Sequence, residues 1–249
     1  MLGGGRKADR VAGDLLRRIV GGSIPVGALL PKEPDLALEY GVNRSVVREA
    51  IKLLEVHRLV RPIKRRGTAV LDPMASVSPE VLQAMLVPSE GRVDRARLRD
   101  YLEIRATLDV QMSVLAAERR TEADLEALDR QVDVLATALG DRERYHHEAD
   151  RFARLVARAT QNRIFEMLVW WNQEVATELR DVLNAVRPAT EPHLTGVRTL
   201  VRLFRERDAA SVRMIVGAYH DWASPRVLAA AALSTGESLS TLISGDHAR

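Results

Sequence analysis

Residues 33–54 constrain the fold of this chain more than any other segment, because they predict two short helices joined by a tight turn. Apolar residues recur at helical spacing on both sides of the turn, at Leu36, Ala37, Tyr40, Val46, Val47, Ala50, Ile51 and Leu54. Gly41 stands where the first helix must end and the chain must reverse, and glycine takes a positive φ there at little cost. The segment therefore predicts a helix-turn-helix.

The second helix of this motif begins with polar and basic residues. Asn43 can cap the helix, and Arg44, Ser45 and Arg48 then project from its first turns. A recognition helix has this arrangement, because its N-terminal residues reach base edges and phosphates in the major groove. The sequence therefore predicts that this part of the chain binds double-stranded DNA.

Two short strands are expected after the motif, at 59–63 and 68–71. Between them lies a basic turn made of Lys64, Arg65, Arg66 and Gly67. Pro62 lacks an N–H group, so the first strand should be short or lie at a sheet edge. Together with an amphipathic helix over 8–21, these elements predict a winged helix-turn-helix domain over residues 1–71.

The rest of the chain reads as a linker at 72–79, an all-helical domain at 80–233 and a flexible tail at 234–249. Thr121 and Asp208 are expected to cap two of the helices. The expected helices lie at 79–87, 95–119, 122–139, 141–160, 162–186, 191–206 and 208–232. The fold class is thus mainly α, a winged helix-turn-helix with a small β-hairpin followed by an antiparallel helical bundle.

Charge and composition narrow the function further. Residues 1–71 hold 14 Lys and Arg against 7 Asp and Glu, whereas the remainder holds 23 against 27. A basic module joined to a mildly acidic one indicates that only the first meets a polyanion. The chain has no cysteine, which excludes disulfides and thiolate sites. It shows no signal peptide and no apolar segment of roughly 20 residues, so we expect a cytoplasmic protein with no membrane partner.

A spaced pattern runs through the N-terminal module, at Gly22, Gly27, Leu30, Pro31, Glu33, Gly41, Arg48, Glu49, Leu59, Arg66, Gly67 and Thr68. This pattern resembles the GntR family of bacterial regulators. A looser pattern follows in the helical part, at Leu102, Glu103, Arg105, Leu108, Asp109, Leu115, Phe152 and Asn162. The second pattern resembles the effector domain of the FadR subgroup. The resemblance implies a homodimeric transcriptional regulator, expected to be a repressor, that is controlled by a small-molecule effector.

The family resemblance also implies which residues meet the operator, a pseudo-palindromic DNA site. The implied DNA-binding residues are Lys32, Asn43, Arg44, Ser45, Arg48, Lys64, Arg65, Arg66 and Gly67. Two positions depart from the family pattern. Pro34 stands where arginine is common, and Arg65 stands at the wing tip where glycine is usual. Both departures bear on the operator sequence rather than on DNA binding itself.

Many members of this subgroup hold a divalent metal through one aspartate and three histidines. Alignment on the second pattern puts residues that do not ligate at those positions, namely Ala149, Ala153, Val197 and Tyr219. The remaining metal candidates are Asp150 and His220, each one residue from an aligned position, and His193, which lies one turn before Val197. Because a helix turns about 100° per residue, adjacent side chains point elsewhere. We therefore expect no metal cofactor.

A member without metal resembles the acyl-CoA-responsive branch, which makes a fatty acyl-CoA the expected effector. Arg105 is the main candidate for the effector site, since a buried guanidinium needs an anionic partner. That partner is either the ligand or an internal carboxylate such as Glu103. Tyr101, Trp171 and Tyr219 are further effector-binding candidates, although Trp171 is equally explained by core or interface packing.

Three alternatives remain open. One is a regulator of the same family that senses a small carboxylate through a bound metal. Another is a metal hydrolase built around His146, His147 and Asp150, but the sequence has no complete catalytic motif, so no enzyme is expected. The third, a purely architectural DNA-binding protein, leaves the large helical domain without a role.

Overall fold

The computed structural model describes residues 7–88, 92–180, 182–183 and 190–234. Within these ranges the chain forms two compact units, which divide between Asp94 and Arg95. The tail expected over 234–249 lies outside the described residues, except for Ser234. No helix in the described ranges is long and apolar enough to cross a membrane.

Three helices form the centre of the first unit, and their bounds are α1 Lys7–Val20, α2 Glu33–Glu39 and α3 Arg44–Val56. Each buries the apolar face that its spacing predicts, and together they enclose one core. The turn between α2 and α3 contains Gly41 at a φ of +61°. The predicted helix-turn-helix is therefore confirmed, including its need for a residue that accepts positive φ.

The hairpin that follows consists of β1 Val60–Ile63 and β2 Gly67–Val70, which pair antiparallel with Val60 opposite Val70. The other side of β2 pairs with the segment around Leu29, through a bridge to Ala69. Strand β1 is therefore an edge strand of four residues, as Pro62 predicted. Backbone hydrogen bonds join β2 to β1 on one side and to residues 27–30, between α1 and α2, on the other.

The first unit extends beyond the sequence-based boundary at residue 71. A short 3₁₀ helix, Pro73–Ala75, leads to helix α4 at Pro79–Leu86. Helix α4 packs against α1 and adds Val81 and Ala84 to the core of the first unit. Burial of this apolar face explains why α4, expected as part of the second domain, groups with the first.

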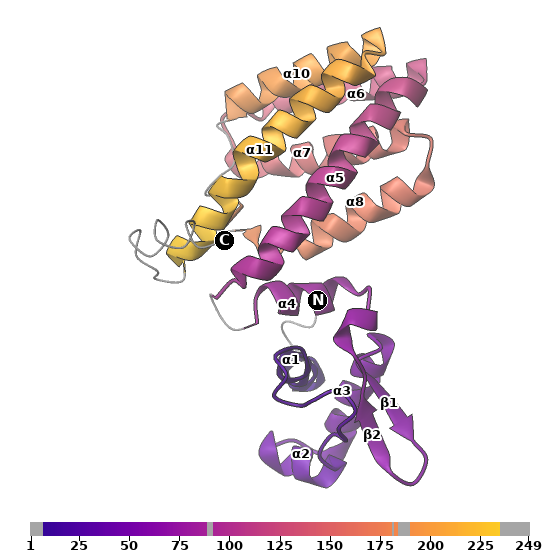
Figure 1. Ribbon diagram of the computed structural model, residues 1–249, viewed down its shortest axis with the longest axis vertical. Helices are drawn as coiled ribbons and strands as arrows, with labels where there is room; N and C mark the ends of the chain where they lie inside the picture. Colours follow the sequence, from indigo (N-terminus) through magenta and orange to yellow (C-terminus); the bar gives the residue numbers. More distant parts are fainter. Residues whose placement is uncertain (1–6, 89–91, 181, 184–189, 235–249) are drawn as a thin grey trace, which may run out of the picture. The chain divides into compact units, whose positions relative to one another are not determined.

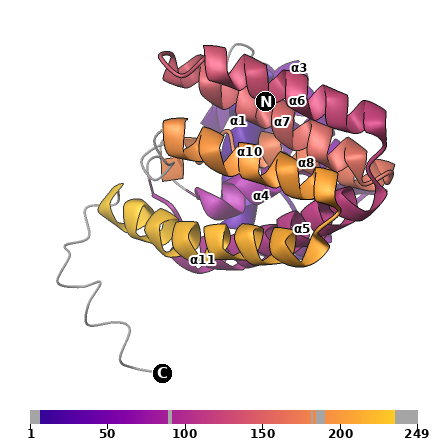
Figure 2. The ribbon, with the colours of Figure 1, turned by 90° about the horizontal axis from the view of Figure 1, so that it is seen from above.

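The second unit is a bundle whose described helices are α5 Arg95–Arg119, α6 Glu122–Thr137, α7 Arg142–Ala159, α8 Arg163–Val175, α10 Thr190–Glu206 and α11 Ala209–Ser234. Helices α5 and α11 lie side by side along most of their length (Figures 1 and 2). Thr121 forms a capping box with Asp124, and Asp208 accepts a hydrogen bond from the Ser211 N–H, so both predicted caps are confirmed.

One predicted helix is shorter than expected. The sequence predicted a continuous helix over 162–186, but α8 ends at Val175. The Thr177 backbone N–H and hydroxyl both donate to the Glu174 carbonyl, at 3.1 and 2.7 Å. These bonds span three residues rather than four, so they tighten the chain into a turn and end the α-helix.

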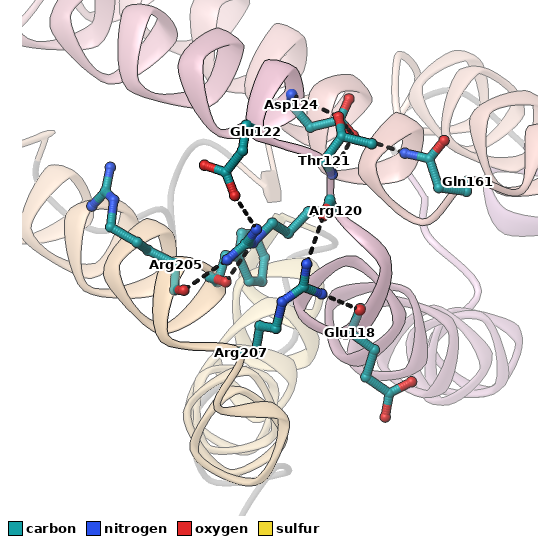
Figure 3. Close-up of polar contacts among 9 residues, drawn as sticks. Glu118, Arg120, Thr121, Glu122, Asp124, Gln161, Arg205 and Arg207 are labelled. Carbon is teal, nitrogen blue, oxygen red and sulfur yellow. Dashed lines mark hydrogen bonds and ion pairs between the residues drawn. The ribbon is translucent and has the colours of Figure 1, made fainter.

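Two arginines join the ends of α5 and α10 reciprocally (Figure 3). Arg120, just after α5, donates from Nε and Nη2 to the carbonyls of Phe204 and Arg205 near the end of α10. Arg207, just after α10, donates to the carbonyls of Glu118 and Arg120. Each guanidinium thus satisfies carbonyls that a helix C-terminus leaves without partners, and its positive charge is stabilised by the negative end of the helix dipole.

Candidate nucleic-acid interface and ligand cavity

The start of α3 is fixed by its own polar side chains. Asn43 has extended backbone angles, and its Oδ1 accepts a hydrogen bond from the Val46 N–H at 3.0 Å. Ser45 Oγ donates to the same oxygen at 2.8 Å. The predicted cap is confirmed, and it leaves Asn43, Arg44 and Ser45 exposed at the helix N-terminus.

Arg48 lies one turn further along α3 and is held by an acidic neighbour. Its Nε is 2.7 Å from Glu33 Oε2 at the start of α2, while 65% of its side chain is exposed. This ion pair orients the guanidinium along the surface of the motif. Arg44 forms no ion pair with any residue that the structure describes, so its charge is directed to solvent.

The wing tip carries the second group of candidate DNA contacts. Lys64, Arg65, Arg66 and Gly67 are all exposed at the turn of the hairpin, and Lys32 is exposed at the start of α2. Arg65 has a φ of +64° and Gly67 a φ of +121°. Positive φ costs a non-glycine residue about 1 kcal/mol or more, which explains why glycine is usual at position 65. Arg58 and Arg207 have positive φ as well, so the backbone angle of Arg65 by itself does not assign it a role.

A cavity of about 540 Å³ lies within the second unit, between α5, α7, α10 and α11. Its volume falls in the range typical of small-molecule sites. Apolar side chains such as Met112, Phe152 and Leu200 form part of the wall. The polar groups in the wall are Arg105, Asp109, Ser113, Tyr145, His146, Asp150, His193, Tyr219 and His220.

Arg105 is the cation of this cavity. Its side chain is 28% exposed and its Nε lies 3.6 Å from Asp109 Oδ2. That distance is too long for a hydrogen bond, and the buried Nε has no acceptor among the described residues. Burial alone would lower the pKa of Arg105, but the Asp109 carboxylate, with help from Asp150, raises it above its usual value. The guanidinium is therefore charged and incompletely satisfied.

Asp109 itself has a second partner. His220 Nε2, on α11, is 3.2 Å from the same Asp109 Oδ2. The internal carboxylate that the sequence left unidentified is thus Asp109 rather than Glu103, which is exposed. Asp109 was not among the predicted site residues, although its position four residues after Arg105, on the same helix face, is a signal for such a pair.

The cavity also bears on the metal site that the resemblance to the FadR subgroup implied. All four positions that correspond to the metal ligands line it, and they are Ala149, Ala153, Val197 and Tyr219. The alternative candidates line it too, but His193 Nδ1 is bonded to the Tyr145 hydroxyl at 2.9 Å and His220 to Asp109. No three acidic or histidine side chains in the described residues group as a metal site. The donor set therefore does not fit a metal ion.

Of the three other residues predicted to bind the effector, one lines the cavity and two do not. Tyr219 lines the cavity, whereas neither Tyr101 nor Trp171 does. The buried Tyr101 hydroxyl donates to Asn172 Oδ1, between α5 and α8. Trp171 is half-buried, while its neighbour Trp170 is 61% exposed and stacks under Arg154. Ser113 and Tyr145, which line the cavity, lacked any sequence signal.

The histidines proposed for a hydrolase do not converge on one site. His146 lines the cavity, whereas His147 does not line it and is exposed. Two adjacent helical residues point about 100° apart, which explains the separation. The side chains that a hydrolytic metal would need are thus not brought together.

Comparisons with known proteins agree with this geometry. Residues 7–70 match the family described as bacterial regulatory proteins, gntR family, and residues 100–220 match the FCD domain. The regulator Rv0494 of Mycobacterium tuberculosis is 30% identical over 86% of this chain and 86% of its own length. The regulator LutR of Bacillus subtilis is 30% identical over 76% of this chain and 82% of its own.

Two further comparisons have lower identity. The galactonate operon transcriptional repressor of Escherichia coli is 27% identical over 65% of this chain and 70% of its own length. The solved structure of Lar, which controls the expression of the Listeria monocytogenes agr system, aligns with a TM-score of 0.59 over 90% of this chain and 98% of that chain. Its 20% identity shows a shared fold only.

Homologues of this kind are transcriptional regulators, and regulators of this family bind operator DNA and an effector. The helix-turn-helix with its basic wing, the helical unit with its cavity and the two family matches lead to one assignment. The chain belongs to the GntR family of bacterial regulatory proteins and carries an FCD domain.

Proposed function

We propose that this protein is a homodimeric repressor whose FCD domain binds a small organic carboxylate directly through Arg105, without a metal. The observation that carries this proposal is the charged Arg105 guanidinium, which lines a cavity while its Nε lacks an acceptor among the described residues. A carboxylate can accept two parallel hydrogen bonds from such a guanidinium. The effector carboxylate would thus supply hydrogen-bond acceptors that the described residues do not give to this guanidinium.

The proposed DNA contacts come from the first unit. Asn43, Arg44, Ser45 and Arg48 would meet the major groove and its phosphates, and the wing residues Lys64 to Gly67 would lie at the minor groove. Lys32, at the start of α2, would contact the backbone. Exposure of all these residues supports the assignment, and two such units in a homodimer would read a pseudo-palindromic operator.

The chemistry of the cavity favours a short polar anion. Ser113, Tyr219 and the Tyr145–His193 pair surround the same space as Arg105 and offer hydroxyl and imidazole groups. A polyhydroxylated acid would use all of these groups. Galactonate is such an acid, and the galactonate operon transcriptional repressor is one relative of this chain.

A fatty acyl-CoA is the second candidate, because it is the effector expected of a metal-free member of the FadR subgroup. The apolar wall formed by Met112, Phe152 and Leu200 would accept part of an acyl chain. The polar groups around Arg105 favour the smaller anion instead, because an acyl chain would leave them without hydrogen-bond partners. The experiment therefore compares a fatty acyl-CoA with the small carboxylate.

Regulation requires the effector to prefer one of two protein arrangements, since equal affinity for both shifts nothing. Arg105 and Asp109 lie on α5, and His220 and Tyr219 lie on α11, the helix packed along α5. A ligand held between these helices would change how they pack. In the proposed mechanism this change moves the two DNA-binding units apart or together and releases the operator.

The proposal is tested by fluorescence anisotropy of the full-length protein on labelled DNA from its own promoter region. D-galactonate, galactose as its neutral analogue, and palmitoyl-CoA are titrated separately. Release by galactonate but not by galactose supports the carboxylate effector, whereas release by palmitoyl-CoA alone supports the second candidate. Absence of DNA binding contradicts the regulator itself, and tight binding that no compound alters contradicts both effector classes.

A further inference from the structure

We infer that Asp109 is an internal counter-ion that pairs with Arg105 in the absence of effector and that the effector carboxylate displaces. The inference rests on the proposed anion site and adds a residue that sets its affinity. In this view Asp109 competes with the effector for one guanidinium. When it loses that competition, it remains paired with His220.

The contact between Arg105 and Asp109 is suited to displacement. The two residues lie four positions apart on α5, and Nε and Oδ2 are 3.6 Å apart. The pair is therefore ionic without being hydrogen-bonded, because the hydrogen-bond range for such groups ends near 3.2 Å. An ion pair of this kind, within one helix and partly exposed to solvent, is weak. A bidentate carboxylate in the cavity would satisfy the same guanidinium better.

Displacement would not leave the Asp109 carboxylate alone. Its Oδ2 is already 3.2 Å from His220 Nε2, closer than it is to Arg105. The His220 side chain is buried, with 9% of its surface exposed. An effector that takes Arg105 therefore leaves Asp109 bound across the bundle to α11, while the pair within α5 is lost. The exchange thus frees Asp109 from its partner within α5, while the contact from Asp109 to His220 keeps α5 linked to α11.

The competing role gives an unusual expectation for a residue inside a ligand site. Removal of an ordinary binding or supporting residue weakens ligand binding. Removal of Asp109 should strengthen it, because the anion site then loses its internal occupant and the cavity loses a negative charge. The sign of the effect therefore separates a counter-ion from a structural support for Arg105.

The test uses acetate as the probe, because it carries a carboxylate and little else. Thermal unfolding of the full-length wild type and of Asp109→Ala is followed as acetate increases at constant ionic strength, with acetamide as the uncharged analogue. We expect acetate to stabilise Asp109→Ala at concentrations about three- to tenfold lower than the wild type requires. Acetamide should not distinguish the two proteins, and the double variant Asp109→Ala/Arg105→Gln should lose the response.

Two further variants keep the test decisive. Glu103→Ala removes an exposed carboxylate from the same helix and should respond to acetate like the wild type. Asp109→Asn keeps the size of the side chain, so it carries the test if Asp109→Ala does not fold. An acetate response of the Asp109 variants that is equal to or weaker than that of the wild type, or absent, overturns the inference.

Failure of the inference and failure of the proposed function give different results. If galactonate releases the wild type from DNA but binds Asp109→Asn more weakly, Asp109 supports the site, and only the counter-ion role is wrong. If no carboxylate releases the wild type from DNA, the proposed effector class fails. An acetate response confined to the Asp109 variants would still show the counter-ion.

Discussion

The two candidate sites of this protein use arginine in opposite ways. At the DNA-binding surface, Arg44 and Arg65 are exposed, and their charges face solvent. In the cavity, Arg105 is partly enclosed and has an internal carboxylate at 3.6 Å. Water stabilises an exposed guanidinium until DNA binds. An enclosed guanidinium has less water around it and needs a counter-ion while no ligand is bound. Arg48 at the DNA-binding surface also has a partner, Glu33 at 2.7 Å, but its side chain is 65% exposed, so what sets Arg105 apart is a counter-ion inside a cavity that a ligand would have to displace.

A buried arginine elsewhere in the second unit sharpens this contrast. Arg120 is buried, but it donates to the carbonyls of Phe204 and Arg205 and pairs with Glu122 at 2.7 Å (Figure 3). Its hydrogen-bonding capacity is filled by the protein. Burial alone therefore does not identify a ligand-binding arginine. What distinguishes Arg105 is that it lines a cavity and that its Nε lacks an acceptor within the described residues.

The largest expected effect is the loss of effector binding in Arg105→Gln. This change removes the charge and the bidentate donor, so the affinity for the carboxylate should fall by more than about 100-fold. DNA binding in the absence of effector should persist, as measured by anisotropy on promoter DNA. Arg154→Gln, which removes a guanidinium that stacks on Trp170 outside the cavity wall, is the matched control. Equal loss in both variants would contradict the assigned site.

The next effect concerns stability rather than ligand binding. Arg120→Met should lower the free energy of unfolding by about 3 kcal/mol, because carbonyls at the end of α10 lose their charged donor. Urea denaturation of the full-length protein measures the loss. Arg130→Met, at an exposed position of α6, should change stability by less than about 0.5 kcal/mol. A small effect at Arg120 would show that water satisfies these carbonyls.

Arg65→Gly should change stability and DNA affinity in opposite directions. Glycine relieves the positive φ at the wing tip and should stabilise the protein by about 1 kcal/mol. The lost charge should weaken operator binding by about tenfold and reduce the salt dependence by roughly one phosphate contact. Thermal unfolding and anisotropy at several salt concentrations measure the two effects. Unchanged DNA affinity would remove Arg65 from the predicted interface.

The smallest expected effect is the pH dependence of stability that Tyr145→Phe removes, and it appears only in alkali. Burial raises the pKa of the Tyr145 phenol to about 12, above the value of about 10 for an unfolded chain. The neutral phenol therefore contributes stability that is fully present below pH 10 and is lost as the pH rises toward 12.

The measurement is the unfolding free energy of the wild type and of Tyr145→Phe as a function of pH. The difference between the two should be constant below pH 10, and the wild type should then lose stability relative to the variant. Parallel curves up to pH 12 would show that this phenol titrates normally in the folded protein.

Much of the structure of the first unit could be predicted from the sequence, because the residues that determine it act on backbone only a few positions away. The cap at Asn43, the reversal at Gly41 and the short edge strand at Pro62 all depend on local backbone geometry, and the structure contains all three. The strain at Arg65 has the same origin. The end of α8 was missed because Thr177 competes for a backbone carbonyl, and the apolar spacing does not report such a bond.

What the sequence by itself determined is therefore the order of elements and the basic winged module, together with the residues Ala149, Ala153, Val197 and Tyr219 at the positions that the resemblance aligned with metal ligands. Only the tertiary structure decided that those positions share one cavity with Arg105, that Asp109 is its partner and that Trp171 lies outside the cavity wall. The physical reason is the distance along the sequence between the residues that interact. Caps and turns are set by neighbours in the chain, whereas this cavity is made by side chains from four helices that packing alone brings together.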